Sequence, residues 1–191
     1  YNTVVNNNLY TNLMARENLW FAAETLRILS EESPERFAVL VRDTNLDVDE
    51  IVEWQRAADL MYLPFDDKEG IHLQDDSFLE KEEWDFAGTP PDKYPLLLHY
   101  HPLVIYRHRV VKQADVVLAM FLLGHEFELD QKRRNFKYYD RVTTRDSSLS
   151  SSIESIIAAE IHEDEKAVQY SIDAGLMDLA DVAGNVKGGC H

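Results

Sequence analysis

Hydrophobic positions recur at helical spacing in the first third of the chain. One stripe steps by four, three, four and three residues and predicts a helix from about residue 9 to residue 30: Ala15, Leu19, Ala22, Leu26, Leu29. A proline at position 34 ends this helix and suits the first turn of a second, shorter one. A further stripe predicts a third helix, with Asp47 and Glu50 as a capping box at its start: Ile51, Trp54, Ala58, Met61.

The chain from residue 65 onward predicts a long loop followed by three helices. Residues 65–102 are rich in Asp, Gly and Pro and show no sustained period, which is typical of a long functional loop. From about Val110 the chain is nearly apolar all round, which predicts a buried helix with Lys112 in its first turn. Asp146-Ser147-Ser148 offers cap chemistry for a helix to about residue 161, and the last helix begins near Glu163. No strand alternation competes, so we predict an all-α fold.

Composition narrows the possible functions. The 191 residues carry a net charge of −16, which disfavours nucleic-acid binding and favours a small ligand. The single cysteine, Cys190, cannot form an internal disulfide, so we expect a cytoplasmic protein. The longest apolar run, residues 116–123, is far below the roughly 20 residues that cross a membrane, so no membrane association is expected.

Basic residues gather in one segment. Residues 106–145 hold nine basic and five acidic residues, a local +4, against −20 for the remainder. Within it, Lys112 and Gln113 supply donors and an acceptor suited to sugar hydroxyls, although a lysine whose stem covers apolar surface is the simpler alternative. Ser147 and Ser148 at a helix start suit an anion, with plain helix capping as the alternative, and His191 follows two glycines that could also approach a phosphate.

The remaining polar residues do not form a recognisable catalytic or metal-binding motif. No carboxylate forms a sharp acid-base motif, so no catalytic residue is assigned within the chain. His99 and His101 lack a third metal ligand at a suitable spacing, so we predict no metal site and no cofactor. The run Lys132-Arg133-Arg134 is expected to be an exposed charge cluster.

Several short motifs of the sequence occur together in one known family. In chain order they are Val4-Val5-Asn6-Asn7-Asn8-Leu9-Tyr10-Thr11-Asn12, Val111-Lys112-Gln113-Ala114-Asp115-Val116, Tyr138-Tyr139-Asp140, Thr143-Thr144-Arg145-Asp146-Ser147-Ser148-Leu149-Ser150, Ala158-Ala159-Glu160-Ile161 and Gly188-Gly189-Cys190-His191. Together they resemble the catalytic domain of glycoside hydrolase family 65, the maltose, trehalose, kojibiose and nigerose phosphorylases and their relatives.

This resemblance implies a fold and a reaction. The fold is an (α/α)6 toroid of twelve helices, of which residues 1–191 would supply about half as a partial catalytic domain truncated at both ends. The reaction is inverting: a glutamic acid protonates the glycosidic oxygen while inorganic phosphate, the co-substrate, attacks the anomeric carbon of an α-linked glucobiose. The products are β-glucose 1-phosphate and glucose. The family's glutamate would directly precede Tyr1, so the fragment is expected to be inactive by itself.

The resemblance also implies roles for individual residues. Lys112 and Gln113 match the pair that holds the glucosyl unit, and Ser147, Ser148 and His191 match the phosphate-binding region. Arg145 stands where a number of members have His, which leaves the disaccharide open, and the chain ends before the Gly-Gly-Trp that usually follows the final histidine.

Two alternatives stay open. A trehalase-like hydrolase of the same fold would use water in place of phosphate, and a non-catalytic helical interaction module would use neither. The sequence also leaves open whether the full-length protein is a homodimer.

Overall fold

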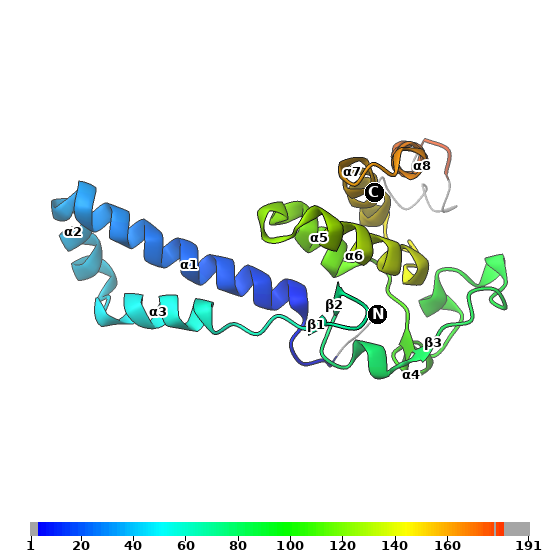
Figure 1. Ribbon diagram of the computed structural model, residues 1–191, viewed down its shortest axis with the longest axis horizontal. Coiled ribbons are helices and arrows are strands. Elements are labelled where there is room, and N and C mark those ends of the chain that lie inside the picture. The colour runs from blue at the N-terminus through cyan, green and yellow to red at the C-terminus, as the bar shows by residue number, and fades with distance from the viewer. Residues whose placement is uncertain (1–3, 178, 182–191) are drawn as a thin grey trace. The chain divides into compact units, whose positions relative to one another are not determined.

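The computed structural model describes residues 4–177 and 179–181, and this part of the chain is mostly helical (Figure 1). It contains eight α-helices and four strands of two residues each, so the prediction of an all-α fold is confirmed. The chain divides into two compact units. The N-terminal unit comprises residues 10–63, and the main unit comprises residues 1–9 and 64–191.

The N-terminal unit holds the three helices that the hydrophobic stripes predict: α1 (Leu9–Glu32), α2 (Pro34–Thr44) and α3 (Asp49–Asp59). Asn12 Nδ2 donates to Tyr62 O at 2.8 Å and so ties the start of α1 to the segment after α3. The predicted capping box of α3 is wrong. Val48 is the N-cap, and the Asp47 carboxylate accepts instead from Asp49 N at 3.1 Å, so the helix starts one residue later than expected.

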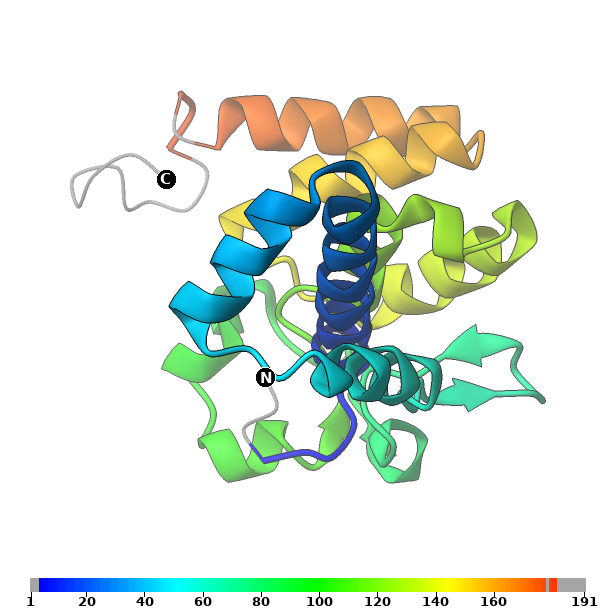
Figure 2. The ribbon, with the colours of Figure 1, turned by 90° about the vertical axis from the view of Figure 1, so that its left-hand side faces the viewer.

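Four longer helices form most of the main unit: α5 (Asp115–Leu122), α6 (Leu129–Val142), α7 (Ser148–Glu160) and α8 (Asp164–Leu176). Helices α7 and α8 pack along each other, and α5 contacts both α6 and α7 (Figure 2). Sequence patterning predicts α7 and α8 but misses α6, which begins with a capping box between Glu128 and Gln131.

The predicted start of α5 is wrong by about five residues. Val111 forms a parallel bridge with Thr143, in which Val111 N donates to Val142 O and Thr144 N donates to Val111 O, both at 2.9 Å. These extended residues cannot also be helical. Lys112 therefore lies before α5 and not in its first turn, and the helix dipole does not act on it as the sequence suggested.

The long segment before α5 contains short regular pieces. β1 (Phe65–Asp66) pairs antiparallel with β2 (Ile71–His72), and β3 (Glu82–Glu83) pairs parallel with β4 (His108–Arg109). The four-residue helix α4 (Pro102–Ile105) lies between β3 and β4. A small core of Leu96, Ile105 and Val110 anchors this segment, with aromatic rings packed around it. The segment before α5 thus has its own hydrophobic cluster.

One residue of the predicted charge cluster is buried. Lys132 is only 4% exposed and pairs with Glu160, so the prediction that the whole run 132–134 faces solvent is wrong. The buried positions of α6 are Lys132, Asn135, Phe136 and Tyr139, which share one face at helical spacing.

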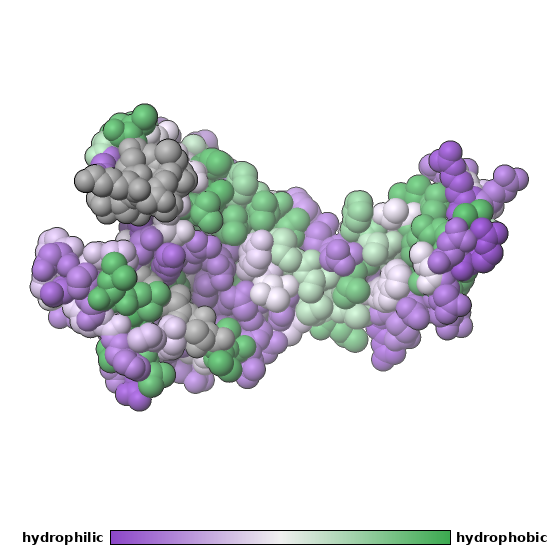
Figure 3. Space-filling model, turned by 180° about the vertical axis from the view of Figure 1, so that it is seen from behind, coloured by the Kyte–Doolittle hydropathy of each residue, from purple (hydrophilic) through white to green (hydrophobic). Residues whose placement is uncertain are grey.

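Hydrophobic residues also reach the surface (Figure 3). In the main unit they include Leu149 on α7 and Val168 and Ile172 on α8. Helices this apolar are expected to pack on further partners. Within the described residues, no helix combines the length and the hydropathy that crossing a bilayer requires.

Candidate functional site

The two residue pairs predicted from sequence lie together in the main unit. Ser147 Oγ donates a hydrogen bond to Gln113 Oε1 at 2.8 Å, and Ser150 Oγ contacts Lys112 O at 3.4 Å. The bridge between Val111 and Thr143 aligns the two segments just ahead of these residues. The segment that carries Lys112 and Gln113 therefore lies beside the start of α7.

Each predicted residue that the structure describes has a defined place at or just before the start of a helix. Ser147 is the N-cap of α7 and accepts from Leu149 N at 3.4 Å, as the sequence predicts. Ser148 is the first residue of α7 and is exposed, and Lys112 is exposed as well. Ser148 and Lys112 are thus open to a ligand, with Ser148 at the positive end of a 13-residue helix. Ser147 is buried, and its hydroxyl is hydrogen-bonded to Gln113 and Leu149. His191 lies outside the described residues.

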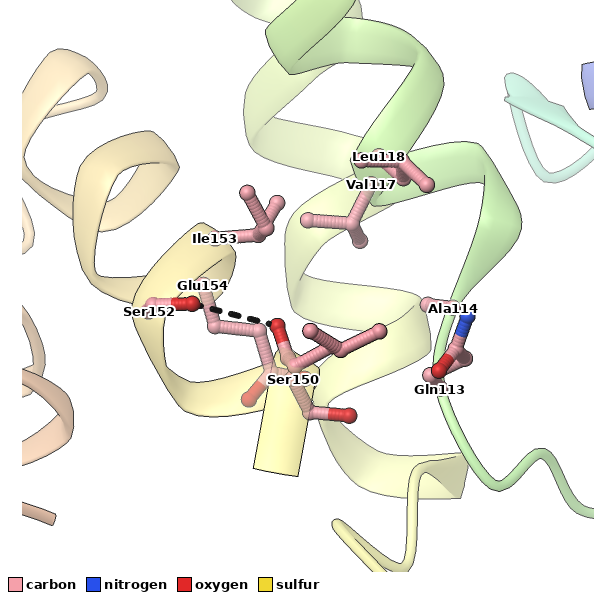
Figure 4. Close-up of a pocket in the computed structure, with 9 residues that line it drawn as sticks. Gln113, Ala114, Val117, Leu118, Ser150, Ser152, Ile153 and Glu154 are labelled. Carbon is pink, nitrogen blue, oxygen red and sulfur yellow. Dashed lines mark hydrogen bonds between the residues drawn. The ribbon is translucent and has the colours of Figure 1, made fainter. Parts of the chain in front are cut away.

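A mostly apolar cavity of about 150 Å³ lies beside the site, between α5 and α7 (Figure 4). Gln113 and Ala114 line it from the segment before α5, and Ile153 faces Val117 across it. The buried residue Glu154 also lines this cavity. The cavity adjoins Gln113 and offers few polar partners of its own.

A charged cluster surrounds Arg145, two residues before Ser147, and sequence reasoning missed it. Arg145 Nε donates to Glu154 Oε2 at 2.8 Å, and Arg145 Nη2 donates to Tyr170 OH at 2.7 Å and to the Asp140 carboxylate. Lys166 Nζ donates to the second oxygen of Asp140 at 2.7 Å. No short sequence signal predicts this cluster, because its members come from α6, α7 and α8.

Burial and neighbouring charges shift the pKa values of the carboxyl groups in this cluster in opposite directions. Burial raises the pKa of Glu154, and the charge of Arg145 and its hydrogen bond oppose that rise. Burial also acts to raise the pKa of Asp140, but hydrogen bonds from Lys166 and Tyr170, together with the charge of Arg145, outweigh it and hold the pKa below its usual value. The pKa of Tyr170 is raised by burial and by its hydrogen bond to Asp140.

A second polar cluster holds the start of α5. Gln74 Nε2 and Asn8 Nδ2 donate to the same oxygen of Asp115, at 2.8 and 3.2 Å. Burial raises the pKa of Asp115, and these two hydrogen bonds oppose the rise. The clearest sequence signal for this cluster is that Asn8 and Asp115 both lie in motifs that carry the family resemblance.

Comparisons with known proteins identify the family of the chain. A family model described as the glycosyl hydrolase family 65 central catalytic domain matches residues 1–191. The chain belongs to glycosyl hydrolase family 65. It is 49% identical over 191 residues to the alpha,alpha-trehalose phosphorylase of Geobacillus stearothermophilus, covering 100% of this chain and 25% of that protein.

Two further matches carry the name kojibiose phosphorylase. The kojibiose phosphorylase of Halothermothrix orenii is 33% identical over 191 residues, which is 100% of this chain and 24% of that protein. A solved structure described as a kojibiose phosphorylase from human microbiome superimposes with a TM-score of 0.85 at 29% identity, covering 98% of this chain and 24% of that one. The chain thus spans about a quarter of the length of these relatives and is consistent with part of an all-α toroid.

Proposed function

We propose that these 191 residues form part of the (α/α)6 catalytic domain of an inverting disaccharide phosphorylase. In this proposal an α-linked glucobiose and inorganic phosphate give β-glucose 1-phosphate and glucose. The observation that carries the proposal is the hydrogen bond from Ser147 Oγ to Gln113 Oε1 at 2.8 Å, because it joins a candidate phosphate ligand to a candidate sugar ligand. A phosphorolytic site needs both kinds of ligand close together, since phosphate must reach the anomeric carbon of the bound sugar.

We propose trehalose as the disaccharide substrate. Two trehalose phosphorylases, from Geobacillus stearothermophilus and Thermoanaerobacter brockii, are 49% and 45% identical to the chain. The kojibiose phosphorylase of Halothermothrix orenii and the maltose phosphorylase of Bacillus subtilis are 33% and 32% identical. Substrate preference in this proposal follows the more similar pair.

Each site residue has a role in the proposed reaction. Lys112 and Gln113 hold the hydroxyls of the glucosyl unit, and Ser147, Ser148 and His191 hold phosphate, with the N-terminal end of α7 stabilising its negative charge. A glutamic acid outside the 191 residues protonates the leaving oxygen. Phosphate takes the place of the activated water of an inverting hydrolase, so one catalytic carboxyl is enough. The proposal invokes no metal and no cofactor.

The experiment uses a chimera, in which the 191 residues replace the matching segment of the Geobacillus stearothermophilus trehalose phosphorylase. The chimera should consume trehalose only when phosphate is present and release β-glucose 1-phosphate, which NMR of the anomeric proton identifies. His191→Ala should weaken phosphate binding by about tenfold or more in isothermal titration, because a charge-assisted hydrogen bond is lost.

The matched control is His125→Ala, which removes an exposed imidazole from the main unit and should leave phosphate binding unchanged. Phosphate-independent release of glucose would support the hydrolase alternative and overturn the phosphorylase proposal. A chimera that neither cleaves trehalose nor binds phosphate would support the interaction module.

A further inference from the structure

We propose that Arg145 is a positioning residue, which fixes Ser147 and Ser148 for phosphate without binding phosphate itself. This inference rests on the proposed function and deepens it. The residue is close in sequence to both serines and carries a positive charge, so direct phosphate binding is the obvious expectation. The geometry of its side chain argues for the other role.

The backbone of Arg145 adopts a conformation that arginine disfavours. Its φ is 58°, in the left-handed region, while Ser147 two residues on is extended with φ −109° and ψ 131°. A residue other than glycine keeps such a conformation only where its surroundings hold it. The conformation re-aims the chain between the bridge at Thr143 and the first turn of α7. The contacts that fix the backbone of Arg145 therefore also fix the position of Ser147 at the start of α7.

Neighbouring residues fix the guanidinium of Arg145 through hydrogen bonds. Each of its three nitrogens donates a hydrogen bond within the main unit: Nε to Glu154, Nη1 to Thr143 O at 3.4 Å, and Nη2 to Tyr170 OH. Its central carbon lies 4.7 Å from the centroid of the Tyr170 ring. One side chain thus connects α7 and α8 to the end of α6, because Nη2 also donates to the Asp140 carboxylate. A fork with five N–H donors suits this geometry, whereas an ammonium does not.

Charge balance within the cluster leaves little attraction for an anion. Arg145 and Lys166 carry two positive charges, and the carboxylates of Asp140 and Glu154 carry two negative charges at hydrogen-bond distance. Phosphate approaching the guanidinium would also meet these two carboxylates. The serines, in contrast, are joined to the candidate sugar pair through Gln113. Arg145 acts on phosphate through the serines.

The test replaces Arg145 with lysine in the chimera. Arg145→Lys keeps the positive charge and the same unfavourable backbone preference, but one ammonium cannot contact Glu154, Tyr170 and Asp140 together. We expect the KM for phosphate to rise by about tenfold, because a misplaced ligand weakens binding, while the KM for trehalose stays within about twofold. Tyr170→Phe, which removes one hydroxyl and keeps the ring, should shift the phosphate KM in the same direction by less.

The matched control is Lys132→Met, which breaks another ion pair between α6 and α7, eight positions earlier on α6 than Asp140. It should lower the Tm without moving the phosphate KM. The inference is overturned if Arg145→Lys changes the phosphate KM no more than this control does. It is also overturned if Arg145→Lys keeps full phosphate affinity at unchanged Tm.

Two further results separate the possibilities. Loss of all measurable phosphate binding in a variant with unchanged Tm would make Arg145 a direct ligand, which contradicts positioning. If Arg145→Lys does not fold, Tyr170→Phe decides, and an unchanged phosphate KM overturns the inference. Failure of the proposed function looks different, because the unsubstituted chimera would then cleave trehalose without phosphate or not at all.

Discussion

Lys132 and Glu160 form an ion pair that joins the first turn of α6 to the last residue of α7. The two partners differ in environment: the Lys132 side chain is 5% exposed, and the Glu160 side chain is 43% exposed. Removing one partner therefore has a different consequence from removing the other. A buried ammonium without a carboxylate is costly, whereas a half-exposed carboxylate can be hydrated.

The first prediction uses this asymmetry. In the chimera, Glu160→Gln should lower the free energy of unfolding by about 2 to 3 kcal/mol, because it leaves the charge of Lys132 buried without its partner. Lys132→Met should cost no more than about 1 kcal/mol, because methionine replaces the buried stem and Glu160 remains hydrated. Urea titration followed by circular dichroism measures both. Equal losses, or a larger loss for Lys132→Met, would show that the lysine charge is not the group that needs a partner.

The second prediction separates capping from phosphate binding at the start of α7. Ser147 is the N-cap and donates to Gln113, so Ser147→Ala should lower stability by about 1 kcal/mol and also raise the phosphate KM. Ser148 is exposed in the first turn, so Ser148→Ala should raise the phosphate KM and leave stability within about 0.5 kcal/mol. Thermal melts and initial rates of the chimera measure the two effects. If both variants leave the phosphate KM unchanged, the serines only cap the helix.

The third prediction concerns pH. Burial lowers the pKa of His72 from 6.5 to about 4, and Nδ1 of its ring lies 3.2 Å from Nδ2 of the fully buried Asn135. The folded state thus holds His72 neutral while the unfolded state binds a proton below pH 6.5. Stability from this group is complete above pH 6.5 and is lost as the pH falls towards about 4.

Comparing Tm against pH in the chimera measures this contribution. His72→Gln has no titrating ring, so its Tm should fall less than that of the unsubstituted protein between pH 6.5 and pH 4, and the two curves should approach each other. His99→Gln, at an exposed position, is the control and should follow the unsubstituted curve. Parallel curves for His72→Gln would show that this imidazole does not take up a proton on unfolding.

Local patterns carried much of the fold prediction. The stripes of α1 and α3 and the serine cap of α7 are short-range features, in which spacing and cap chemistry decide the structure. Helix α6 escaped prediction because its buried face includes Lys132 and Asn135, which read as polar surface. The start of α5 was misplaced because the bridge from Val111 to Thr143, 32 positions apart, overrides an apolar run that suits a helix equally well.

The candidate site also has parts that the sequence predicts and parts that it does not. Motif resemblance identified Gln113 and Ser147, but no spacing rule could show that the two side chains share a hydrogen bond. The cluster around Arg145 is harder still, because Asp140, Glu154 and Tyr170 come from three helices whose packing brings them together. A candidate site residue can be recognised from its neighbours in the sequence. The ion-pair partner of a charged residue depends on how the helices of the main unit pack.

The fourth prediction contrasts two glycines of the main unit. Gly70, in the turn between β1 and β2, has φ 65°, and a Cβ there would lie 2.8 Å from Arg134 Nε, the same atom that donates to Gly70 O. Gly70→Ala should therefore cost about 1 kcal/mol or more, since alanine disfavours this φ and would disturb the hydrogen bond. Gly175 lies in the last turn of α8, where a Cβ would meet no heavy atom of the described residues within 4 Å. Gly175→Ala should raise stability by about 0.5 kcal/mol, because alanine loses less backbone entropy in a helix. Thermal melts of the two chimera variants should move in opposite directions, and a destabilising Gly175→Ala would mean that the end of α8 packs against a neighbour in the complete protein.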